Sequence, residues 1–250
     1  MLIGCTEQVD SLDHHSKPFV KKDPLAGLSL DDAIKRHLGA TLSIPATEKY
    51  TYEIYRGDCN GDDSLDMVIT VNLLDRALDA AINSGNTAKR AELGYMGNYN
   101  YFVYVDGFTR KFGAPKPIAS SPHAKLVVNF DHIRTEKQKD FTIDYRIRDS
   151  GYRNFYTIVN GNPVHILQVP IFDGIGKTET SASKIRLEPG TLSTSKDVVV
   201  YEGSFENATF DDPMDIYTFE PKIVGTDKIV RRWFFSEAAF KYYTEKDQSN

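Results

Sequence analysis

One nine-residue stretch carries the side chains whose types and spacing could do the most specific chemistry. Residues 58–66 read Asp-Cys-Asn-Gly-Asp-Asp-Ser-Leu-Asp, which places oxygen-bearing residues at the first, third, fifth, seventh and ninth positions. Oxygens at alternate positions of a tight loop can converge on a hard cation such as Ca²⁺. We therefore predict a calcium site formed by the side chains of Asp58, Asn60, Asp62 and Asp66 and by the backbone carbonyl of Ser64.

This spacing does not make a standard EF-hand loop. The twelfth position is Ile69, where an EF-hand has a bidentate Glu. The alternative is an acidic turn without a metal, in which water solvates the carboxylates. If calcium binds, a structural role is favoured over a catalytic one, because no nucleophile or general-base motif adjoins the loop. Cys59 is predicted to be a small buried hydrophobic residue rather than a reactive thiol.

The elements that must position this loop are two predicted strands, residues 49–56 and 67–71, followed by a strand at 99–105 with an Asp106-Gly107 hairpin turn. Here the sequence resembles the FG-GAP/VCBS family, whose calcium loop reads Asp-x-Asn/Asp-x-Asp-Gly-x-x-Asp between two strands. The resemblance covers residues 50–112 at most, with residues 72–98 as an insertion. Asp63 replaces the Gly of the family pattern. Because only one copy is present, the propeller that the family usually builds is not expected.

The start of the chain, Met-Leu-Ile-Gly-Cys, resembles the lipobox of bacterial lipoproteins. The resemblance implies a lipid anchor on Cys5 and an extracytoplasmic, outer-membrane location, on the periplasmic or the cell-surface side. Residues 6–24 are polar and predicted to be a flexible tether. Their acidic residues resemble the export signal of surface lipoproteins in Bacteroidetes-type bacteria. The apolar and basic residues that precede a lipobox are missing, so a later start than the natural one is expected; a chance match of four residues is the alternative.

Strands dominate the rest of the chain. Helices are expected at 30–38, after Ser29 as N-cap, and at 72–85, with one more turn at 87–93. The Pro- and Ser-rich residues 113–122 predict a domain boundary. Beyond it, strands are predicted at residues 126–130, 140–148, 153–159, 164–172, 198–201, 216–219 and 229–235, with a last strand or helix at 236–243 and a polar loop at 174–183. Alternation along 140–148 favours a sheet with one solvated face.

These patterns predict a mainly β (α+β) fold in three parts. Residues 1–24 hold the lipobox and tether. Residues 25–119 form an α+β part with short helices and the calcium-loop hairpin. Residues 120–250 form an antiparallel β-sandwich or jelly roll.

Composition excludes several classes of protein. The net charge is −5 and the basic residues are scattered, which argues against a nucleic-acid partner. None of the six histidines forms a zinc-binding pair, and there is no nucleophile elbow or phosphate-binding loop. No apolar run approaches the length of a membrane span.

Three other groups of residues have a functional and a plain interpretation. Glu202/Glu206 and Asp211/Asp212/Asp215 fit glycosidase carboxylates, a second calcium site or, as favoured, a solvated acidic rim. Aromatic residues fit a sugar-stacking platform or protein interface if exposed and core if buried, with core favoured: Tyr95, Tyr99, Tyr101, Tyr104 and residues 233–235. Arg146, Arg148 and Arg153 fit an acidic ligand or, as favoured, a solvated sheet face.

The function predicted from the sequence is therefore that of a non-catalytic, extracytoplasmic calcium-binding lipoprotein. It would bind a protein or glycan, or assemble, in the cell envelope. The alternative is a calcium-dependent carbohydrate-active hydrolase or its accessory domain, which would need two facing carboxylates in a cleft.

Overall fold

The computed structural model describes residues 25, 27–85, 97–206, 208–210, 215–217 and 219–244. The predicted lipid anchor Cys5, the tether and the helical turn at 87–93 lie outside these residues. The described part is mainly β, as predicted. It holds helices α1 (Leu30–Thr41) and α2 (Leu74–Asn83), the 3₁₀ helix η2 (Asp215–Tyr217), and strands β1 (Thr51–Gly57), β2 (Asp66–Asn72), β3 (Asn100–Val105), β4 (Lys116–Ile118), β5 (Val127–Asp131), β6 (Asp140–Ile147), β7 (Ser150–Val159), β8 (Asn162–Asp173), β9 (Ser181–Glu188), β10 (Asp197–Glu206), β11 (Lys222–Ser236) and β12 (Lys241–Thr244).

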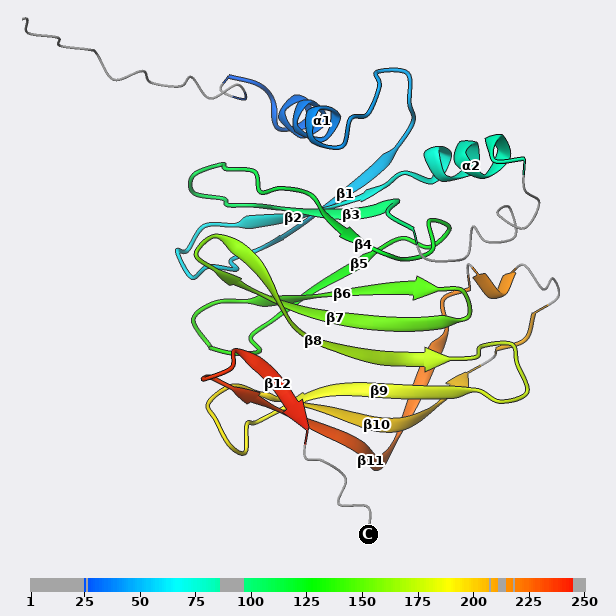
Figure 1. Ribbon diagram of the computed structural model, residues 1–250. Helices are drawn as coiled ribbons and strands as arrows, with labels where there is room; N and C mark the ends of the chain where they lie inside the picture. Colours follow the sequence, from blue (N-terminus) through cyan, green and yellow to red (C-terminus); the bar gives the residue numbers. More distant parts are fainter. Residues whose placement is uncertain are drawn as a thin grey trace, which may run out of the picture.

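The strands form two antiparallel sheets. One has the order β1-β2-β3-β4 and the other the order β5 to β12, so neighbours in sequence are neighbours in space (Figure 1). Such an order is a meander of hairpins, without the crossovers that a jelly roll requires. Of the two architectures predicted for residues 120–250, the sandwich is the one that fits, and the jelly roll is not formed.

The long sheet bends between β8 and β9, where only two residue pairs join the strands, Phe172↔Ala182 and Asp173↔Ser181. A core cluster lies between the two halves, with Phe155 and Val169 from one half and Val198, Phe235 and Tyr242 from the other. The opposite face of β5–β8 packs on the four-stranded sheet through a second cluster. Strands β5–β8 therefore form a middle layer that is buried on both faces.

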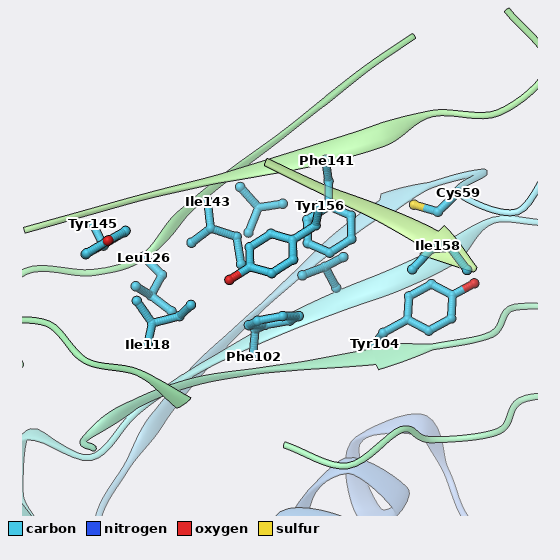
Figure 2. Packing of buried hydrophobic residues seen from close by; sticks show 12 residues of the cluster. Cys59, Phe102, Tyr104, Ile118, Leu126, Phe141, Ile143, Tyr145, Tyr156 and Ile158 are labelled. Carbon is cyan, nitrogen blue, oxygen red and sulfur yellow. The ribbon is translucent and has the colours of Figure 1, made fainter. Parts of the chain in front are cut away.

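Residues from both sheets make up this second cluster (Figure 2). Phe102 of β3 lies with its ring centroid 5.9 Å from that of Phe141 in β6 and 5.0 Å from that of Tyr156 in β7. All three side chains are at most 6% exposed. The packing thus joins residues on either side of the boundary predicted between 119 and 120.

The prediction that residues 140–148 form a sheet with one solvated face is wrong. Thr142 and Arg146 are buried, because the second half of the long sheet covers that face together with Ile216 of η2 and Phe219. The guanidinium of Arg146 donates to the backbone carbonyls of Phe219, at 2.5 Å, and Ile216, at 2.7 Å. Ile216 lies in η2, so the strand predicted at 216–219 is also wrong.

Residues 113–122 are not only a linker. Lys116–Ile118 forms the edge strand β4, in which Pro117 pairs with Tyr101 of β3. Pro is tolerated there because an edge strand does not need every N–H for its ladder. Strand β9 was not predicted, since its sequence is largely polar and its exposed positions outnumber the buried ones.

Helix α1 covers the outer face of the four-stranded sheet. Its N-cap is Ser29, as predicted, whose hydroxyl accepts the N–H of Asp32 at 3.1 Å. Ile34 and Leu38 pack against Ile69 and Val103 of the sheet. The helix continues past residue 38, its predicted end, and stops at Thr41.

Candidate calcium-binding loop

The loop 58–66 closes the β1–β2 hairpin. The strands pair from Thr51↔Asn72 to Gly57↔Asp66, so the loop begins at Asp58 directly after the last pair. The predicted strand–loop–strand setting is thereby confirmed. Gly61 and Asp63 adopt left-handed conformations, with φ of 77° and 64°. Asp tolerates this region better than most residues, which explains how Asp63 can replace a Gly.

Side-chain oxygens fold the loop by accepting its own backbone N–H groups. The two carboxylate oxygens of Asp58 accept the N–H groups of Gly61 at 2.8 Å and Asp63 at 3.1 Å. Asn60 Oδ1 accepts the N–H of Asp62 at 3.1 Å, and Asp62 Oδ1 accepts that of Ser64 at 2.8 Å. These are local turns of the kind that Asp and Asn favour. They leave each carboxylate oxygen with a second lone pair.

Asp66 lies at the base of the loop and is fully buried. Its Oδ2 accepts the N–H of Cys59 at 2.9 Å, and its Oδ1 accepts the N–H of Gly107 at 2.8 Å. Burial raises the pKa of Asp66, while the two backbone N–H groups act in the opposite direction. Cys59 is also buried, as predicted, and burial raises the pKa of its thiol.

A second turn, residues 106–111, packs against the loop. The hairpin predicted after 99–105 is present, since Val105 and Phe112 form an antiparallel bridge. The prediction of a tight two-residue turn at Asp106-Gly107 is wrong, because the residue with positive φ in this turn is Arg110. Glycine is required at position 107 for close packing, because a Cβ atom there would lie 2.2 Å from the carbonyl oxygen of Leu65.

Asp106 is the residue of this site that the ligand prediction missed. Asn60 Nδ2 donates to Asp62 Oδ2 at 3.0 Å and to Asp106 Oδ2 at 3.3 Å, so the amide lies between two carboxylates. The hydroxyl of Thr109, aided by its N–H, lowers the pKa of Asp106. The turn after β3 thus adds a carboxylate beside the loop, a contact that no local pattern encodes.

The donor set fits a hard cation in chemistry, since it consists of carboxylates, an amide and a backbone carbonyl. The side chains, however, are not arranged around a common centre. Among the described residues, no group of three or more His, Cys, Asp or Glu side chains is placed so that it could hold a metal ion. The carboxylates instead face the N–H groups of the loop. Binding would require some of these side chains to turn toward a shared centre.

The other residues singled out in the sequence have structural roles where they are described. Tyr104 and Phe235 are buried, and Tyr99, Tyr101 and Trp233 pack against core clusters, so these aromatic residues form core, as favoured. Arg153 pairs with Asp144 at 2.6 Å. Glu202 and Glu206 pair with Lys228 and Lys222 on an exposed part of β10. Tyr95, Asp211 and Asp212 lie outside the described residues.

Comparison with known proteins gave no match, whether with family models, with curated proteins or with solved structures. The likeness to FG-GAP/VCBS loops therefore stays a resemblance of one short stretch. In the part of the chain that the structure describes, no helix is both long enough and apolar enough to cross a membrane.

Proposed function

We propose that this protein is a non-catalytic, calcium-stabilised binding or assembly module of a bacterial cell envelope. The observation that carries the proposal is the placement of the Asn60 amide between the carboxylates of Asp62 and Asp106. With the Asn60 amide turned so that its oxygen replaces its nitrogen there, a cation would be attracted by both carboxylates. Asp58, Asn60, Asp62 and Asp66 would hold the ion through side chains, and Ser64 through its carbonyl.

The ion would supply charge neutralisation and rigidity rather than catalysis. Several carboxylates on one turn repel each other, and a divalent cation removes that repulsion. The loop and the turn 106–111 would then be fixed relative to each other. The envelope location and the membrane anchor rest on Cys5, and the partner is an envelope protein or glycan rather than a nucleic acid.

The hydrolase alternative has less support. A retaining or inverting glycosidase needs two carboxylates that face one bond across a cleft. Glu202 and Glu206, the best candidates with described side chains, are instead engaged in exposed ion pairs with lysines. These two residues therefore do not provide the facing pair of carboxylates that a hydrolase needs.

Isothermal titration with CaCl₂ tests the proposed site. We expect saturable binding to the wild-type protein and its loss in D58N/D62N. Each Asn removes the charge and keeps one side-chain oxygen, so at position 58 one of the two loop N–H groups loses its acceptor. The matched control is D63N, which removes an exposed carboxylate that is not a proposed ligand. Equal binding to all three proteins, or none to the wild type, would contradict a site at this loop.

Mass spectrometry of the native membrane fraction tests the anchor. We expect the mature chain to begin at Cys5 and to carry acyl chains. An unmodified Cys5, or a chain that continues upstream through it, would contradict the proposed location while leaving the calcium site open to its own test.

A further inference from the structure

A hollow of about 410 Å³ lies where β4 ends beside the middle layer. Tyr152, Asn154 and Tyr156 alternate along β7 and therefore face the same side, toward Tyr145 of β6 and Gln168 of β8, while Pro117 of β4 forms part of the wall. In Figure 2, Tyr145 and Ile118 lie together at one end of the core cluster. The four-stranded sheet covers the rest of this face but leaves this end open.

Aromatic rings form one part of the lining. Tyr145 and Tyr152 are stacked, with ring centroids 5.6 Å apart and an angle of 26° between the planes. Tyr145 is buried, whereas Tyr152 is only partly buried. The face of an aromatic ring is electron-rich and apolar, so it packs well against polarised C–H groups.

Amide side chains form the other part. Asn154 is 8% exposed, and its Nδ2 donates to the hydroxyl of Tyr156 at 3.2 Å. Its Oδ1 is buried and has no hydrogen-bond partner among the described residues. Exchanging the two amide atoms would leave the nitrogen without a partner instead. Buried polar atoms are nearly always paired, so an unpaired one in a residue that lines a hollow points to a missing partner, which a water or a ligand can supply. Gln168 is exposed at the rim and donates to the hydroxyl of Tyr145.

None of the residues that line the hollow is charged. A charged ligand would find no counter-charge there, and burying it would carry a desolvation cost. The lining instead suits a neutral molecule that offers apolar C–H faces and several hydroxyl groups. The volume falls in the range of small-molecule sites, about 300–1,000 Å³.

We propose that this hollow binds a neutral saccharide, which stacks on the exposed face of Tyr152 and hydrogen-bonds to the amides of Asn154 and Gln168. The inference rests on the proposed role as an envelope binding module and names the chemistry of its partner. It does not depend on calcium, because the loop 58–66 contributes nothing to the lining.

The test is titration of the full chain with neutral hexasaccharides of glucose, mannose, xylose and N-acetylglucosamine, in calcium and again in EGTA. We expect at least one to bind in both buffers. Y152L keeps an apolar side chain but removes the aromatic face, and should weaken binding by about tenfold. Q168A changes only an exposed rim residue and should also weaken it. The control is Y243A, which removes an exposed tyrosine on β12 and should leave affinity unchanged.

Two results would overturn the inference. One is the absence of binding to every neutral hexasaccharide, or binding that Y152L and Q168A leave unchanged. The other is saturable binding of a proline-rich peptide that Y152L and Q168A weaken, with no saccharide bound, since that would make the hollow a peptide site. Failure of the calcium titration with saccharide binding intact would count only against the calcium part of the proposed function.

Discussion

The carboxylate of Asp66 accepts the backbone N–H of Gly107 at 2.8 Å, across 41 residues of sequence. The same side chain accepts the N–H of Cys59 from the other side. One fully buried residue therefore joins the β1–β2 loop to the turn after β3. This makes Asp66 a structural residue in addition to a proposed calcium ligand.

Replacing Asp66 with Ala should destabilise the protein even in EGTA. The change leaves two backbone N–H groups without their acceptor, and each unpaired buried donor costs about 1–3 kcal/mol. Because the N–H of Gly107 is only partly buried, we expect a loss of about 2–4 kcal/mol in the free energy of unfolding. Urea denaturation measures it. D63N is the control and should change stability by less than about 0.5 kcal/mol. Equal losses in the two variants would contradict the role given to Asp66.

Gly107→Ala should be more harmful than a glycine substitution at an open turn. The added Cβ would meet the Leu65 carbonyl at 2.2 Å and push the turn away from the loop, which we expect to cost about 3 kcal/mol. Gly161→Ala is the control: nothing lies within 4 Å of its Cβ position, and its φ of +73° predicts a cost of about 1–2 kcal/mol. Urea unfolding of both variants gives the comparison. A smaller loss for G107A than for G161A would contradict the close packing of loop and turn.

The sequence predicted the structural features that depend on residues adjacent in the chain. The strand–loop–strand setting of residues 58–66 and the Ser29 cap follow from local rules and are present. The predictions that failed concern contacts between residues that lie far apart in the sequence. Arg146 looked solvated because the alternation along β6 does not reveal the second layer that covers it. The contact of Asp106 with Asn60, and the hollow around Tyr152, arise only when separate strands meet, so neither could be inferred from spacing.

Phe102→Leu should lower the stability of both sheets together. Phe102 is 1% exposed and contacts Phe141 and Tyr156 across the layers, so we expect a loss of about 1–3 kcal/mol. The fluorescence of Trp233, the one tryptophan of the chain, reports on the far layer. We expect its urea midpoint to fall with that of the circular dichroism. Leu192→Ala, at an exposed site, is the control. An unchanged Trp233 midpoint in F102L would instead support units that unfold separately at the 119/120 boundary.

His37 should make stability depend on pH. Its Nε2 lies 3.0 Å from the carbonyl oxygen of Gly113, and burial lowers its pKa below the ordinary 6.5, against the effect of that carbonyl. The folded state then binds fewer protons than the unfolded state. The contribution of His37 to stability is therefore complete above its pKa in the unfolded state, and it is lost as the pH falls toward its pKa in the folded state. We expect the urea midpoint to drop between about pH 7.5 and pH 5.5, and to drop less in H37Q. Identical pH profiles would contradict the assignment.

Thermal unfolding with saturating CaCl₂, compared with EGTA at equal ionic strength, tests the central claim most directly. At a free calcium concentration 100 times the dissociation constant, a single site stabilises by about 2.7 kcal/mol. For a chain of this size, that corresponds to a rise of about 5–10 °C in Tm. We predict this rise for the wild-type protein and for D63N, and none for D58N/D62N. An unchanged wild-type Tm, or an equal rise in D58N/D62N, would contradict calcium binding at the Asp58–Asp66 loop.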